Sequence, residues 1–149
     1  MDHRRTWYVV TDGGRARILQ RRETGDAFDT HREFVSPDIH RHTRELGMER
    51  PGRTHERAGS ARHALQPRQD LHRADKRKFV DEVARALNEA GTRDEFDRLV
   101  LAAPAHALRE LNRALDAATK RKVAAQLQKD LTNVPNAALA EHFADLHAA

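Results

Sequence analysis

The chain has 149 residues with a net charge of +4 and 38% hydrophobic residues, which is enough for one domain with a single buried core. Cysteine is absent, so disulfides and thiolate chemistry are excluded, and no apolar run of about 18 residues could form a membrane-spanning helix. The N-terminus, MDHRRTWYVV, lacks the length and cleavage pattern of a signal peptide. We therefore expect a cytoplasmic protein.

Two strands are predicted near the N-terminus. Trp7–Thr11 is aromatic and β-branched, and Asp12-Gly13-Gly14 ends it as a turn. Arg15–Arg22 can pair back on it as a second strand. Its alternation places Ala16 and Ile18 on one face and the two arginines Arg15 and Arg17 on the other.

A third strand and a long loop follow. Ala27–Val35 comes after a turn at Gly25-Asp26 and is closed by Ser36-Pro37, which completes an antiparallel meander. Gly and Pro then recur, so an exposed loop is predicted at about 46–69. A loop of that length in a compact domain is usually functional or disordered.

The second half alternates between helix and strand. Asp70 can cap a helix that runs to about Ala90 and stops at Gly91. Arg98–Ala103 is predicted to be a central buried strand. The expected buried stripe of this first helix is Phe79, Val83, Leu87 and Ala90.

Three further segments complete the prediction. Pro104 starts a helix, and Pro135 opens a last one, for which Thr132 or Asn133 could be the cap. Lys122–Gln128 stays open between helix, which its Ala content favours, and strand, which its place favours. The inward side chains of the two helices are expected to be Leu108, Leu111 and Leu115, then Leu139, Phe143 and Leu146. The prediction is thus an α/β fold over residues 1–149, with a mixed sheet from an N-terminal three-strand meander followed by alternating helices and strands.

Positive charge is concentrated in Arg50–Lys78. This segment holds nine Lys/Arg, three Asp/Glu and three His in 29 residues, whereas residues 1–49 are neutral and residues 79–149 are net −2. Such a segment is too polar to build a core, and a polyanion is its expected partner. It contains no aromatic residue, which favours recognition of a nucleic-acid backbone or shape over reading of stacked bases.

Several pieces of the chain resemble the bacterial host attachment protein family: WYVVTDGGRARIL, RPGRTHERAGSARHA, FDRLVLAAPAHALRELNRAL and KDLTNVP, in this order. That family is similar in turn to the central domain of archaeal and eukaryotic class I translation release factors, whose fold is RNase H-like. In those factors a basic loop carries Gly-Gly-Gln before a long helix. Here Ala58 and Gly59 stand at the two Gly positions and Ser60 at the Gln, which is too short to place water at a peptidyl-tRNA ester.

The resemblance and the charge together predict a non-enzymatic module that binds RNA or the ribosome, with no cofactor, metal or membrane. The glycines would let backbone N–H groups approach phosphates. The predicted nucleic-acid-binding residues are Arg50, Arg53, Arg57, Gly59, Ser60, Arg62, His63, Arg68 and Arg73.

Two alternatives stay open. Asp12 could centre a metal-dependent nuclease or phosphoryl hydrolase with Asp97 and Asp130, although Asp-Gly is more often simply a turn. The second alternative is a protein-interaction module linked to host attachment. Other sites are weaker, because His-x-His at His40 and His42 is a poor metal signature and Ser60 lacks the context of a nucleophile.

Overall fold

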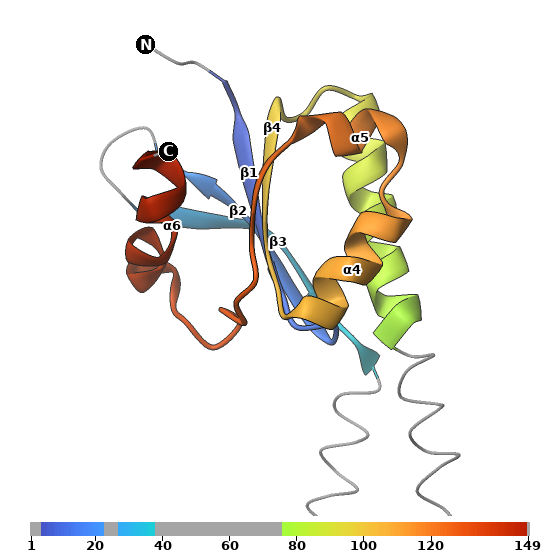
Figure 1. Cartoon of the computed structure of the whole chain (residues 1–149), viewed down its shortest axis with the longest axis horizontal. Helices are drawn as coiled ribbons and strands as arrows, with labels where there is room; N and C mark the ends of the chain where they lie inside the picture. The colour runs from blue at the N-terminus through green and yellow to red at the C-terminus, as the bar shows by residue number, and fades with distance from the viewer. Residues whose placement is uncertain (1–3, 23–26, 38–75, 149) are drawn as a thin grey trace, which may run out of the picture.

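Five strands form one mixed sheet in the computed structural model, which describes residues 4–22, 27–37 and 76–148 (Figure 1). The strands are β1 (Thr6–Thr11), β2 (Arg15–Arg21), β3 (Phe28–Val35), β4 (Arg98–Ala102) and β5 (Val123–Leu127). Their order across the sheet is β3-β2-β1-β4-β5. The β1–β2 and β2–β3 pairs are antiparallel, and β1–β4 and β4–β5 are parallel.

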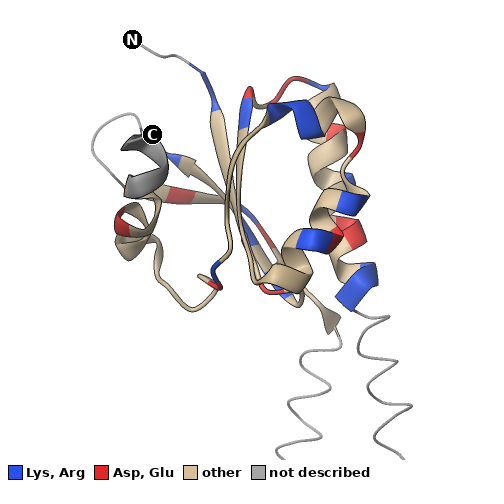
Figure 2. Cartoon of the chain, viewed as in Figure 1, with Lys and Arg blue, Asp and Glu red and all other residues tan. Residues whose placement is uncertain are grey.

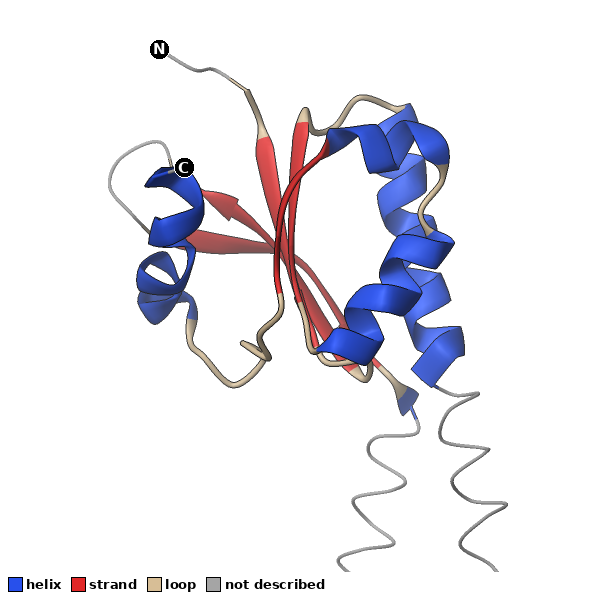
Figure 3. Ribbon diagram, viewed as in Figure 1, coloured by secondary structure: helices blue, strands red, loops and turns tan. Residues whose placement is uncertain are grey.

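One face of the sheet is covered by a helix over residues 76–92 and by α4 (Ala105–Ala114), with the short α5 (Ala117–Lys122) beyond them (Figure 3). Alternate strand side chains such as Trp7, Val9 and Ile18 point into this layer. They pack against apolar residues at helical spacing, among them Phe79, Val83, Leu87, Leu111 and Leu115.

The opposite face is covered by a 3-10 turn, η1 (Asn136–Ala138), and α6 (Leu139–Ala148). Tyr8 is buried between the rings of Phe28 and Phe143, with ring centroids 4.9 Å and 5.0 Å away. Burial raises the pKa of the Tyr8 hydroxyl. Because the central strands β1 and β4 are buried on both faces, helices on both sides of the sheet are needed to cover them.

The predicted α/β fold and the three-strand meander are confirmed, with strand ends within one residue of those expected. Ala16 and Ile18 do face the helical layer, while Arg17 faces the other side. Lys122–Gln128 is resolved as strand β5 after the short helix α5, which was not predicted. The RNase H-like relationship stays a prediction.

Two predicted helix ends need correction. The helix over residues 76–92 continues through Gly91, and the glycine allows close packing there, since a β-carbon would lie 3.0 Å from Thr119 Oγ1. Pro135, and neither Thr132 nor Asn133, is the N-terminal residue of the η1–α6 segment. Leu139 and Phe143 are buried as predicted, whereas the Asp70 cap and the side chain of Leu146 lie outside the described residues.

Candidate functional site

Four strands end at the same side of the sheet. We call this side the carboxyl edge and define it as residues 11–15, 35–37, 103–107 and 127–132 together with Lys76. Pro37 and Lys76, which flank residues 38–75, both lie here (Figure 1). In open α/β sheets, ligands bind at the carboxyl ends of the parallel strands.

The turn after β1 is held by its own side chains. Asp12 Oδ1 accepts hydrogen bonds from the amides of Gly14 and Arg15, each 2.8 Å long. Thr11 Oγ1 accepts from the Gly13 amide at 3.2 Å and donates to the Arg15 carbonyl at 2.7 Å. Asp12 therefore has the structural role of a turn residue, whose side chain satisfies backbone donors.

Gly13 brings the turn close to two helices. Its φ of +95° is a conformation that residues with a β-carbon rarely adopt. A β-carbon at this position would lie 3.9 Å from Cγ and Cδ of Lys76 and 4.0 Å from Cβ of Ala107. The aliphatic part of Lys76 thus lies beside the turn and the first turn of α4.

A second connection links the turn to the loop after β5. Thr132 Oγ1 donates to Asp130 Oδ1 and lies 3.4 Å from Asp12 Oδ2. Asp130 Oδ1 also accepts from the Thr132 amide at 3.0 Å, a contact within its own loop. The structure therefore brings Asp12 and Asp130 together across one hydroxyl.

Asp97 does not join these carboxylates. It lies at the opposite edge of the sheet, where the Arg5 amide donates to Asp97 Oδ2 at 2.8 Å and the Arg5 guanidinium pairs with it at 3.3 Å. These hydrogen bonds lower the pKa of the Asp97 carboxyl. Within the described ranges, no group of three or more His, Cys, Asp or Glu could hold a metal ion.

Arg17 anchors the loop after β5 to the sheet. Its guanidinium donates to Asn136 Oδ1 at 2.6 Å and to the carbonyls of Leu131 at 2.9 Å and Val134 at 2.6 Å. Burial lowers the pKa of Arg17, and the nearby Glu33 carboxylate opposes this effect. The sequence placed Arg17 on the correct face, but its partners lie more than 110 residues away and had no local signature.

The start of the helix over residues 76–92 is basic, and the neighbouring loops of the carboxyl edge carry both basic and acidic residues (Figure 2). Arg15, Lys76, Arg77 and Lys129 are all exposed in this region. The nearby Asp12 and Asp130 carboxylates accept hydrogen bonds from the turn and from Thr132. Lys76 and Arg77 belong to Arg50–Lys78, and the body of the fold adds the exposed Arg15 and Lys129 beside them.

The residues predicted to bind nucleic acid lie outside the described residues. The histidines in and around the predicted loop lie outside them as well. The structure therefore leaves these predictions untested. They are Arg50, Arg53, Arg57, Gly59, Ser60, Arg62, His63, Arg68 and Arg73, together with His40, His42, His55 and His72. The segment that carries them is nevertheless attached to the carboxyl edge at both of its ends.

Comparison with known families agrees with the sequence motifs. Residues 7–143 match the family model described as "Protein required for attachment to host cells". The chain belongs to this host attachment family. A search of curated proteins found no match. The match to the host attachment family spans the whole sheet and reaches into α6, so the fold described above is that of a family member.

One property of the described helices bears on whether this family member could cross a membrane. None of the helices within the described residues is long and apolar enough to span a membrane.

Proposed function

We propose that this host attachment protein is a non-enzymatic module that binds RNA, as a free strand or on the ribosome. Arg50–Lys78 would supply most of the phosphate contacts, and the carboxyl edge would supply the rest. The observation that carries the proposal is the position of Lys76 beside Gly13, which joins the most basic part of the chain to the exposed cations of the edge.

Charge favours a polyanion as the ligand. Arg15 and Lys129 are exposed, and neither forms an ion pair with another described residue. Two cations away from the edge are paired, Arg113 with Glu110 at 2.7 Å and Lys122 with Asp94 at 3.0 Å. Binding of phosphates by unpaired Lys and Arg releases counterions from the nucleic acid, which drives association.

The motif similarity to release-factor central domains supports RNA over other polyanions. It also supports binding without hydrolysis, because Ser60 stands where those factors carry the Gln that helps to place water. A metal-dependent hydrolase centred on Asp12 is not favoured. One oxygen of this carboxylate is already occupied by two backbone amides, which is the arrangement of a turn.

The test is RNA binding to the full chain, measured by fluorescence anisotropy at several salt concentrations and followed by co-sedimentation with ribosomes. Affinity should fall steeply with salt. Replacing both Arg53 and Arg62 with Ala should weaken binding strongly and reduce the salt slope by about two, since each lost phosphate contact lowers it by about one.

The carboxyl edge has a matched control. Lys129→Ala should reduce the salt slope by about one, whereas Lys120→Ala should leave it unchanged. Both lysines are exposed, but Lys120 precedes β5 and therefore lies at the opposite edge of the sheet. Equal effects of the two changes would show that the edge is not the binding surface. RNA affinity that survives the double Arg change, or capture of a specific protein without RNA, would favour the protein-interaction alternative.

A further inference from the structure

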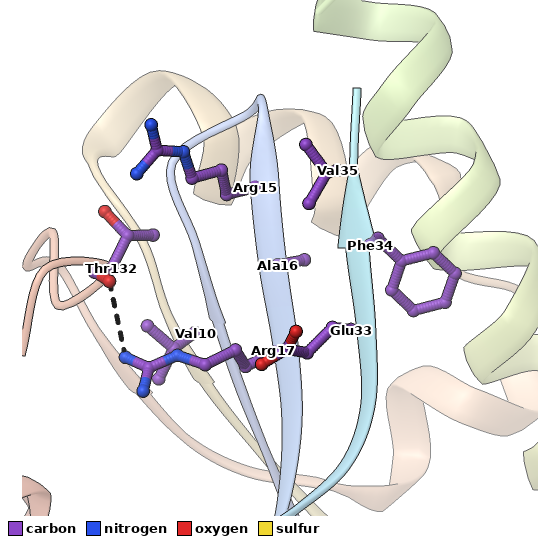
Figure 4. Close-up of a pocket in the computed structure, with 8 residues that line it drawn as sticks. All are labelled: Val10, Arg15, Ala16, Arg17, Glu33, Phe34, Val35 and Thr132. Carbon is purple, nitrogen blue, oxygen red and sulfur yellow. Dashed lines mark hydrogen bonds between the residues drawn. The ribbon is translucent and has the colours of Figure 1, made fainter. Parts of the chain in front are cut away.

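A pocket opens on the α6 side of the sheet, where β2 and β3 approach the carboxyl edge. It has a volume of about 180 Å³. Figure 4 shows the side chains of Arg15 and Arg17 reaching the same side as Thr132, while the ring of Phe34 points the opposite way. The lining residues are Val10, Arg15, Ala16, Arg17, Glu33, Phe34, Val35 and Thr132.

The pocket has an apolar part that solvent reaches. Val35 is 49% exposed, and no other large hydrophobic side chain of the described residues is classed as exposed. Val10, fully buried, lines the pocket from β1. Exposed apolar surface at a concave site is suited to a flat, weakly polar group that can lie against it.

The polar part of the pocket contains one free donor and one free acceptor. Arg15 and Glu33 are both exposed, and neither side chain takes part in a hydrogen bond or salt bridge within the described residues, while the Glu33 carboxylate acts electrostatically on Arg17. Arg15 is the pairing partner of Val35 and Glu33 that of Arg17, so the two groups stand on the same face of the β2–β3 ladder with the Ala16–Phe34 pair between them. Both residues line the pocket, so a ligand there meets a guanidinium and a carboxylate.

The charged groups that line the pocket make a simple anion an unfavourable ligand. Arg17 is committed to Asn136 and to the carbonyls of the loop after β5, so it has little capacity left for a phosphate. Glu33 would repel a negative ligand, and Arg15 would repel a positive one. The pocket therefore suits a neutral, planar group that has an N–H donor next to an acceptor.

We propose that this pocket holds one unstacked nucleobase with an exocyclic amino group beside a ring acceptor, as in cytosine. Glu33 accepts from the amino group, Arg15 donates to the ring nitrogen or carbonyl, and Val35 packs against the ring. In the same pose uracil exchanges both positions, because its carbonyl oxygen would face the Glu33 carboxylate and its ring N–H would face the Arg15 guanidinium. The inference rests on the proposed RNA binding and adds a base preference that phosphate contacts cannot supply.

The test compares labelled oligo(C) and oligo(U) of equal length, which carry the same charge, by anisotropy with the full chain. Wild-type protein should bind oligo(C) about tenfold more tightly, which is near the lower end of discrimination by side-chain contacts to a base. Glu33→Gln should reduce this ratio to near one without weakening oligo(U), because it removes a repulsive charge. Arg15→Ala should weaken oligo(C) more than oligo(U).

Glu89→Gln is the matched control, since it removes the same charge from an exposed position on the helix over residues 76–92. It should leave the oligo(C) to oligo(U) ratio unchanged. Equal wild-type affinity for the two oligomers, or a preference that survives Glu33→Gln, would overturn the base pocket while RNA binding itself stands. If neither oligomer binds at low salt, the proposed function fails and the pocket inference fails with it.

Discussion

The guanidinium of Arg17 donates a 2.6 Å hydrogen bond to the carbonyl of Val134, 117 residues further along the chain. This contact joins β2 to the loop that precedes η1 and α6. The same guanidinium reaches Leu131 and Asn136, and Asn136 in turn donates to Thr30 Oγ1 at 2.8 Å. One charged side chain thus fixes the loop that forms a wall of the pocket and one side of the carboxyl edge.

Replacing Arg17 with Ala should destabilise the fold by about 2–4 kcal/mol, because it leaves several partly buried carbonyls without their charged donor. Arg17→Lys should recover less than half of the loss, since an ammonium cannot reproduce the planar fork. Urea unfolding followed by circular dichroism measures both. Arg15→Ala, two residues away and exposed, is the control and should change stability by no more than about 0.5 kcal/mol. Equal losses at the two positions would contradict the anchoring role.

Replacement of Asp12 distinguishes its structural role in the turn from the hypothesis that it is the centre of a metal-dependent hydrolase. Asp12→Asn keeps a side-chain oxygen for the two amides and should be nearly neutral, whereas Asp12→Ala should cost about 1 kcal/mol. Thermal unfolding of the three proteins checks this order. RNA incubated with wild type and Mg²⁺ or Mn²⁺ should stay intact. Cleavage that disappears in Asp12→Asn would instead establish a metal-dependent nuclease.

Gly13→Ala should destabilise the protein by about 1–2 kcal/mol through the backbone alone. The reason is the φ of +95°, since the nearest atoms to an added β-carbon are 3.9 Å away and give no clash. Gly91→Ala is the contrasting change, because its backbone is helical but its β-carbon would lie 3.0 Å from Thr119 Oγ1. Denaturant midpoints of both variants test the distinction. Full stability of Gly13→Ala would mean that the turn adopts another conformation.

Acid should weaken the fold through carboxylates whose pKa is lowered in the native state. The Thr119 amide, which donates to Asp116 at 2.8 Å, lowers the pKa of Asp116, and the Arg5 amide and guanidinium lower that of Asp97. Their stabilisation is fully present above the ordinary carboxyl pKa of about 4 and is lost as the pH falls through the lowered native values. Stability should therefore rise from about pH 2 to pH 5.

Asp116→Asn tests the contribution of one group, because Asn can still cap α5 but does not titrate. Its unfolding midpoint should depend less on pH than that of wild type over the acid range. Asp81→Asn, at an exposed carboxylate 3.5 Å from Arg113, is the comparison. An unchanged pH profile in Asp116→Asn would show that this cap does not contribute to acid sensitivity.

Local patterns predicted most of the architecture. Trp7–Thr11 and Arg98–Ala103 are apolar runs with turn residues at their ends, and Leu111, Leu139 and Phe143 recur at helical spacing, so short-range chemistry was sufficient for them. Val123–Leu127 was ambiguous because its strand state depends on pairing with β4, which composition does not encode.

The sequence by itself determined that this is an α/β chain whose excess positive charge lies in one segment, because periodicity and charge are local properties. It also identified the family motifs and the turn at Asp12. Only the tertiary structure decided that Lys76 lies beside Gly13, that Thr132 bridges Asp12 and Asp130, and that Arg15 and Glu33 share a pocket. These neighbours come from different strands and loops, and their proximity follows from the order and register of the sheet.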